Sequence, residues 1–208
     1  MVYRCGVQTT GIPSRQIRAA QTDTTLTVYQ AYSPAIALPA LEHGRFVPPF
    51  KSTRMTWIKP SFLWMAYRCG WASKEGQEHV LAIEISKAGF ESALANASLS
   101  HFESGTYASR DEWLVRKNST PVRVQWDPER DLRLQPLEHR AIQVGLSGTA
   151  SREYVDTWTV DITEVTGLMK EIHGLVDSSN LDQARQLLPV ETAYQLSSSL
   201  ARAIGVHT

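Results

Sequence analysis

The residues with the clearest chemical potential lie in one short stretch, residues 54–65, which reads RMTWIKPSFLWM. It carries two cations, Arg54 and Lys59, beside two tryptophans. Because proline disfavours helix in the residue before it but fits the first turn of a helix, Pro60 predicts a strand followed by a helix. The free N–H groups at the helix start and both cations would form an anion-binding site. The alternative is a buried aromatic helix behind a strand, with both cations in solvent.

The sequence lacks the motifs of several common catalytic sites. It contains no glycine-rich phosphate loop, dinucleotide fingerprint, zinc-protease helix motif or nucleophile elbow. Its six histidines are dispersed, and Cys5 and Cys69 lack metal-ligand spacing, so we expect no metal. The carboxylates Asp127, Glu129 and Glu138 do not mark a catalytic pair. The remaining Arg, Lys, aromatic and amide side chains are typical of a nucleotide site, since guanidinium groups suit phosphates and aromatic faces suit flat rings.

Charge is unevenly distributed along the chain. The 208 residues have a formal net charge of zero, but residues 1–70 hold eight basic and two acidic side chains. This polarity predicts a positive cleft in one part of the fold and fits a small phosphate-bearing ligand better than non-specific nucleic-acid binding. No apolar run has the length of a membrane span, and the first residues do not resemble a signal peptide, so we expect a cytoplasmic protein without membrane association.

Two strands and the helices around them carry the strongest secondary-structure signals. Residues 25–32 are β-branched and aromatic, and strand alternation puts Gln30 and Tyr32 on one face and Tyr29 on the other. Residues 78–85 predict a second, buried strand. Helices are expected after Ser33-Pro34 to about residue 43, from residue 60 or 61 to about 70, and after Ser86 to about 97.

The remaining segments predict a mixed fold. Further strands are expected at residues 113–115, 122–126, 141–146 and 158–162, with a turn at 127–130. Further helices are expected at 151–157, from a Thr163 cap to 176, and at 181–204 with a break at Pro189. The fold class is therefore α+β, with a mixed, mainly antiparallel β-sheet core and flanking helices in a single domain. The core would span residues 15–162, a helical C-terminal appendage residues 163–205, and a loose leader residues 1–14.

Several strings of the sequence resemble one known family. These are RQIRA from residue 15, VYQAY from 28, GRFVPPF from 44, residues 54–65, QWDPER from 125 and RAIQVGL from 140. They look like the uncharacterised family catalogued as domain of unknown function 4291, over roughly residues 15–175. This resemblance implies family membership and no particular activity.

A second resemblance implies an activity. The strand with Gln30, a helix, Gly44, and then a strand with Thr56 is similar to the opening of the ADP-ribosyltransferase fold. In that fold Gln143 would match the late-strand Glu or Gln, and Gln30, or one of Arg15 and Arg18, would take the first-strand role. The resemblance implies NAD as the substrate, with no metal, and Gln143 and Gln30 as the catalytic residues. The NAD-binding residues would be Arg15, Arg18, Tyr29, Tyr32, Arg54, Thr56, Trp57 and Lys59.

The expected function is therefore that of an NAD-dependent ADP-ribosyltransferase acting on nucleic acid or on a small acceptor. Arginines would hold the diphosphate, aromatic rings would enclose the nicotinamide, and Gln143 would bind a ribose hydroxyl opposite Arg54 and Tyr29. Two other classes stay open: a nucleic-acid-binding or processing module that uses the basic first third, and a non-catalytic nucleotide-binding protein. The sequence specifies neither the acceptor nor the oligomeric state.

Overall fold

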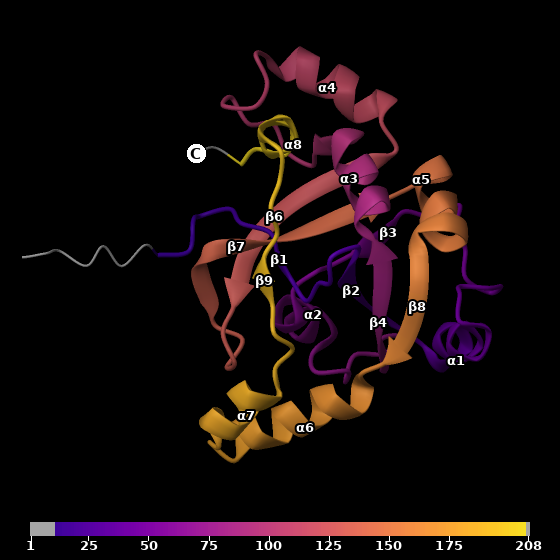
Figure 1. Ribbon diagram of the computed structural model, residues 1–208, viewed down its shortest axis with the longest axis vertical. Coiled ribbons are helices and arrows are strands. Elements are labelled where there is room, and N and C mark those ends of the chain that lie inside the picture. Colours follow the sequence, from indigo (N-terminus) through magenta and orange to yellow (C-terminus); the bar gives the residue numbers. More distant parts are fainter. Residues whose placement is uncertain (1–10, 207–208) are drawn as a thin grey trace, which may run out of the picture.

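A computed structural model describes residues 11–206 as two larger β-sheets packed face to face, a third sheet of two short strands, and helices around them (Figure 1). Most of the expected leader lies outside these described residues. The first sheet is antiparallel and has the order β2 (Thr25–Tyr32), β4 (His79–Ser86), β8 (Thr159–Glu164). The second sheet has the order β3 (Thr56–Ile58), β7 (Pro136–Leu146), β6 (Val122–Arg130), β5 (Ala97–Leu99). Only the β5–β6 pair of these two sheets is parallel, so the α+β prediction with a mainly antiparallel core is confirmed.

Alternation along the strands builds the main core between the two sheets. In β2, Leu26 and Val28 point into this core, where they meet Ile83 of β4 and Val144 of β7. The opposite face of β2 carries Tyr29, which belongs to a second buried cluster. The sequence predicted this division of β2 correctly, because buried apolar side chains at every second position specify the strand face.

Three helices cover the outer face of the first sheet. They are α2 (Phe62–Cys69), α6 (Thr166–Asp177) and α7 (Leu181–Leu187), and their apolar side chains form the second cluster with Tyr29 and Val80. The helix pair α6 and α7 lies across one end of the molecule, and α4 (Arg110–Ser119) and α8 (Ser198–Ala203) lie at the other end (Figure 1). Most of β2 and part of β4 are therefore covered on both faces, whereas β8 keeps one face exposed to solvent.

The helix starts at Ser33, Ser61 and Ser86 are confirmed. Helix α1 (Pro34–His43) ends at Gly44, whose φ of 63° is left-handed and suits glycine. Helix α3 (Lys87–Ala95) begins with the Ser86 hydroxyl accepting a hydrogen bond from the Gly89 N–H. The Ser33 side chain makes no such bond. A continuous α-helix and π-helix, α5 (Gly148–Glu153) and η1 (Tyr154–Trp158), replaces the helix expected at 151–157.

The C-terminal part contains the expected helices, with a break near Pro189, but it is not purely helical. After α7 the chain forms β9 (Thr192–Ala193), which pairs with β1 (Arg18–Ala19) near the start of the described residues. Residues 163–164 extend β8, and α6 starts at Thr166 instead of after Thr163. The Thr166 hydroxyl accepts a hydrogen bond from the Val80 N–H at 2.8 Å, which fixes the helix start against β4. The last segment is thus tied to the main fold by backbone pairing as well as by helix packing.

Two further predictions, a strand at residues 113–115 and a turn at residues 127–130, were wrong for local reasons. Trp113 lies in helix α4, which starts where the Ser109 hydroxyl accepts from the Glu112 N–H. The expected turn at residues 127–130 is the end of β6, which continues past Pro128 to a bulge. Proline fits there because β5 pairs only with the first residues of β6, so that edge needs no donor at Pro128.

No helix within residues 11–206 is both long enough and apolar enough to cross a membrane.

Gly89 tests how closely α3 packs on the core. A methyl group at Gly89 would overlap the buried ring of Trp158, whereas one at Gly174 in α6 meets no atom within 4 Å. We expect Gly89→Ala to lower the free energy of unfolding by about 1–3 kcal/mol through overpacking. Gly174→Ala should raise it by about 0.5–1 kcal/mol, because alanine favours helix. Chemical denaturation measures both, and a stabilising Gly89→Ala would contradict this packing.

Candidate functional site

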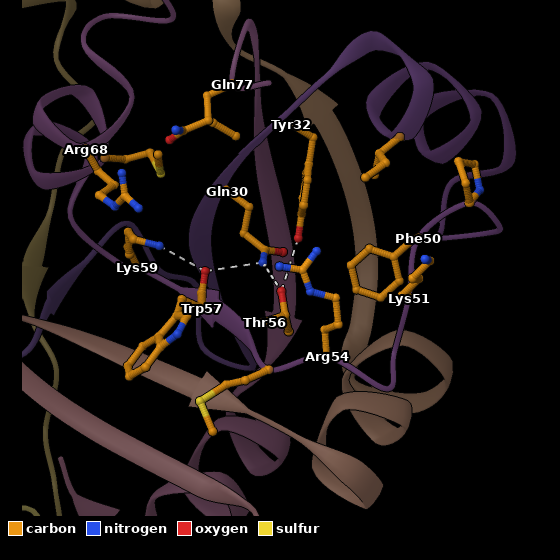
Figure 2. A pocket seen from close by; sticks show the side chains of 15 residues that line it. Gln30, Tyr32, Phe50, Lys51, Arg54, Thr56, Trp57, Lys59, Arg68 and Gln77 are labelled. Carbon is orange, nitrogen blue, oxygen red and sulfur yellow. Dashed lines mark hydrogen bonds between the residues drawn. The ribbon is translucent and has the colours of Figure 1, made fainter. Parts of the chain in front are cut away.

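The main pocket lies between β2, β3 and the connections on either side of them (Figure 2). Its volume is about 400 Å³, within the range of about 300–1,000 Å³ that is typical of small-molecule sites. Side chains of four kinds meet there: cations, aromatic rings, amides and apolar groups. The lining residues are Gln30, Ala31, Tyr32, Ile36, Pro49, Phe50, Lys51, Arg54, Met55, Thr56, Trp57, Lys59, Met65, Arg68 and Gln77.

A buried glutamine organises one wall of this pocket. Gln30 is 3% exposed, because strand alternation turns it toward the core with Val28. Its amide nitrogen donates to the Thr56 hydroxyl at 2.6 Å and to the Trp57 carbonyl at 3.2 Å. Its amide oxygen accepts from the Tyr154 hydroxyl at 2.7 Å. These bonds satisfy a buried amide that would otherwise destabilise the fold, and they tie β2 to β3.

Tyr32 and Thr56 extend the network toward the open part of the pocket. Their hydroxyl groups lie 3.1 Å apart (Figure 2). Burial raises the pKa of Tyr32 to about 12, although its hydrogen bond with Thr56 opposes the shift. Tyr32 therefore stays protonated near neutral pH and acts there as a neutral hydrogen-bonding group.

Lys59 is the unusual cation of the pocket. It is 6% exposed, and its ammonium group donates to the Trp57 carbonyl at 3.0 Å. Burial, together with the nearby charge of Arg68, lowers the pKa of Lys59 to about 7, against weaker opposing effects of Cys69 and Asp127. Near neutral pH this amine therefore exists in both protonation states.

The start of α2 does not form the expected anion site with Arg54 and Lys59. The Ser61 hydroxyl caps the helix by accepting from the Trp64 N–H, as the sequence predicts. The Phe62 N–H, however, donates to the carboxyl group of Glu191 at 2.7 Å. A distant acidic side chain of the same chain thus occupies the helix start, and the expectation of a ligand there was wrong.

Glu191 belongs to a second, smaller cavity, which is also lined by Ser61 and Phe62 at the start of α2. This cavity has a volume of about 190 Å³ and also contains Glu129, Arg18 and His139. Burial raises the pKa of Glu191 to about 8, with a further contribution from the Glu129 charge and opposing effects of the Phe62 N–H and Arg18. Burial likewise raises the pKa of Glu129, whose carboxylate accepts from the Ser61 hydroxyl at 2.9 Å. Glu191 therefore anchors the C-terminal segment to the start of α2, and Glu129 anchors β6 to the same helix start.

Six of the ten site residues expected from the sequence line the main pocket. They are Gln30, Tyr32, Arg54, Thr56, Trp57 and Lys59. Arg15 instead forms a two-pronged ion pair with Glu103 and donates to the Gly205 carbonyl at 2.6 Å. Arg18 donates to the backbone carbonyl of Glu191 at 2.7 Å and lines the second cavity. Both arginines hold the ends of the fold together and lie outside the main pocket, contrary to the expectation that one of them shares a cleft with Arg54 and Lys59.

Tyr29 and Gln143 also lie outside the main pocket. Tyr29 faces the second cluster, where its ring packs edge-on against Phe62 at 5.4 Å. Gln143 pairs with Gln125 across β7 and β6, on the sheet face opposite Val144 of the core. Its amide nitrogen donates to Asp127 at 2.7 Å. Alternation along β7 was predicted correctly, but Gln143 does not point into the cleft opposite Arg54.

Other pocket residues were not expected from the sequence. Lys51 and Arg68 add two cations, Phe50 adds a ring, and Gln77 adds an amide. The sequence contains some indication of the two cations, because both contribute to the excess of basic residues in positions 1–70. Phe50 and Gln77 had none, since they come from a proline-rich connector and from the turn after α2, whose paths depend on tertiary packing.

The pocket can therefore hold an anion beside a flat ring. Four of its described lining residues are cationic and none is acidic. Trp57 contributes a half-buried ring to the pocket. Trp57 pairs with Gly145 across β3 and β7, and its indole packs so closely on Gly145 that a side chain at residue 145 would press against the ring. Within residues 11–206, no group of three or more His, Cys, Asp or Glu side chains is arranged to hold a metal ion.

Residues 16–194 match the model of a family described as domain of unknown function (DUF4291). This match confirms the first resemblance seen in the sequence. No curated protein matches the chain. The family description names no activity, so the chemistry of the pocket has to carry any assignment of function.

The raised pKa of Glu191 predicts a specific pH dependence of stability. Between pH 4.5 and about 8 the folded chain keeps a proton on Glu191 that the unfolded chain has lost. The stabilisation is complete below the pKa that Glu191 has in the unfolded chain, and it is lost as the pH rises through the pKa that Glu191 has in the folded chain. The loss is up to about 1.4 kcal/mol per pH unit. Glu191→Gln should remove this fall while keeping the bond from Phe62.

The measurement is urea unfolding of both proteins at several pH values from 4.5 to 8.5. We expect the variant to gain stability relative to the natural chain as pH rises. Glu138→Gln, at an exposed carboxylate of β7, is the matched control and should leave the profile unchanged. Parallel profiles for the natural chain and Glu191→Gln would show that Glu191 is ionised in the folded protein, contrary to this account.

Proposed function

The chain belongs to the DUF4291 family of unknown function, and from the chemistry of its pocket we propose that it binds NAD or a related nucleotide. The observation that carries the proposal is the set of four basic side chains, Lys51, Arg54, Lys59 and Arg68, around a cavity whose described lining residues include no carboxylate. Positive charge that is not neutralised within the pocket favours an anionic ligand, and guanidinium groups suit the oxygens of a diphosphate.

The other lining side chains support a nucleotide over a bare anion. Trp57, Tyr32 and Phe50 provide aromatic surface for a nicotinamide or adenine ring (Figure 2). Gln77 and the hydroxyl of Thr56 provide hydrogen-bonding groups for a ribose or a base edge.

The reaction that we propose is transfer or hydrolysis of ADP-ribose, in which the bond between the ribose C1′ and the nicotinamide nitrogen breaks. Support comes from the ADP-ribosyltransferase resemblance, because its first-strand and second-strand positions are bonded here, Gln30 to Thr56 at 2.6 Å. Gln30 uses its whole amide within the protein, so it positions Thr56 and Tyr32 rather than reacting. Gln143 has no contact with the ribose in this proposal, and the cations hold the diphosphate while C1′ reacts.

A non-catalytic nucleotide-binding protein is the second candidate. It is favoured by the absence of an acidic group among the described lining residues, since the cation that develops at C1′ would have no carboxylate beside it. Chromatography of NAD incubated with the protein separates the two functions. Release of nicotinamide supports the transferase, and unchanged NAD with saturable binding supports the non-catalytic protein.

Arg54 provides the test of nucleotide binding. We expect Arg54→Gln to weaken NAD binding by about tenfold, because a charge-assisted contact with a phosphate contributes about 1.5–3 kcal/mol and Arg54 is solvent-exposed. Titration calorimetry measures the affinity. Arg133→Gln, which removes the same charge from the exposed turn between β6 and β7, should bind as the natural chain does. Gln143→Ala should also bind unchanged.

The outcomes separate the site from the ligand. If the natural chain binds no NAD at millimolar concentration, the ligand is wrong, and ATP, ADP-ribose and short single-stranded nucleic acids are tested in the same way. A second outcome is that NAD binds to the natural chain and equally well to Arg54→Gln, but not to Gln143→Ala. The proposed location is then wrong, and the nucleotide binds on the outer face of β7.

A further inference from the structure

Lys59 is buried without an acidic partner among the described residues, an environment that is not needed for a lysine that only holds a phosphate. Its ammonium group has one hydrogen-bond acceptor, the Trp57 carbonyl, and forms no ion pair with any carboxylate in residues 11–206. It lines the pocket while remaining 6% exposed, and Arg68 lines the same part of the cavity (Figure 2). Buried lysines are ordinarily paired with an acid, so the missing partner favours the uncharged amine.

An uncharged lysine amine is a nucleophile. Proteins activate lysine for attack on carbonyl carbons by removing it from water and by placing another cation close to it. Both conditions hold at Lys59, since burial and the charge of Arg68 act in the same direction on its pKa. Lys51 lines the same pocket but is exposed, which leaves Lys59 as the amine in the less solvated position.

We propose that Lys59 forms a reversible Schiff base with the aldehyde of a phosphorylated ligand. The lone pair of Nζ attacks the carbonyl carbon, and a proton moves from nitrogen to the former carbonyl oxygen. The resulting hydroxyl group then leaves as water together with the second proton of the amine, and a C=N bond between ligand and lysine remains. The step involves no oxidation or reduction, and water reverses it.

The surrounding side chains define the class of ligand. Arg54, Arg68 and Lys51 suit a phosphate group, and Trp57 suits a flat ring next to the carbonyl. An aldehyde that carries a phosphate, aromatic or sugar-derived, combines these features. This activity goes beyond nucleotide binding and does not rest on it, because NAD has no free aldehyde.

The inference predicts a selectivity between lysines. At pH 7 an exposed lysine with a pKa of about 10.4 is uncharged in roughly one molecule in 2,500. Lys59, with its pKa of about 7, is uncharged in about half of the molecules. The reactive fraction therefore differs by on the order of 10³, which is large enough to survive slower access to a buried site.

Pyridoxal 5′-phosphate is a suitable probe, since it joins an aldehyde, a ring and a phosphate. The full chain is mixed with an equimolar amount at pH 7, the imine is reduced with borohydride, and peptides are mapped by mass spectrometry. We expect at least tenfold more adduct on Lys59 than on any other lysine. Adduct spread evenly over exposed lysines such as Lys74 and Lys170 would overturn the proposal.

Two controls identify the chemistry and the residue. Pyridoxine 5′-phosphate, which has an alcohol in place of the aldehyde, should compete with the probe and form no adduct itself. Lys59→Met should lose the main adduct, and Lys170→Met, at an exposed lysine of α6, should keep it. If Lys59→Met does not fold by circular dichroism, the peptide map of the natural chain decides alone. NAD calorimetry is independent of this result, so either proposal can fail without the other.

Discussion

The hydrogen bonds from Gln30 to β3 connect the two sheets at the place where the pocket opens. The amide of Gln30 donates to the Thr56 hydroxyl and to the Trp57 carbonyl. The backbone N–H of the neighbouring residue, Tyr29, donates to the Lys59 carbonyl at 2.7 Å. The Trp57 carbonyl also accepts from the Lys59 amine. One short strand thereby positions the ring, the hydroxyl and the buried amine of the pocket, so its geometry depends on how β3 meets β2.

The parts of this arrangement that local patterns determine were predictable from the sequence. Alternation placed Gln30 and Tyr32 on the core face of β2, and the serine caps located three helix starts. The basic excess of the first 70 residues correctly predicted a positive cleft that contains Arg54 and Lys59. These features depend on side-chain periodicity and on hydrogen bonds between near neighbours, which a sequence displays directly.

The features that failed depend on contacts between distant segments. Glu191 reaches the start of α2 from beyond α7, and no local pattern indicates that the helix start is already occupied. Arg15 forms an ion pair with Glu103 and donates a hydrogen bond to the Gly205 carbonyl, although its charge alone suited a phosphate. Gln143 has the expected alternation, but which face of β7 meets the pocket is decided by the packing of two sheets. Residue type suggested the chemistry, and tertiary packing decided its location.

The central claim is that the cationic pocket beside β3 is where a nucleotide binds. Hydrogen–deuterium exchange with and without saturating ADP-ribose tests it most directly, because it locates binding without assuming a reaction. The account predicts slower exchange in peptides that cover residues 49–59 and 65–77, with no change at residues 125–145 or 188–193. Protection confined to either of the latter segments, or no protection anywhere, would contradict it.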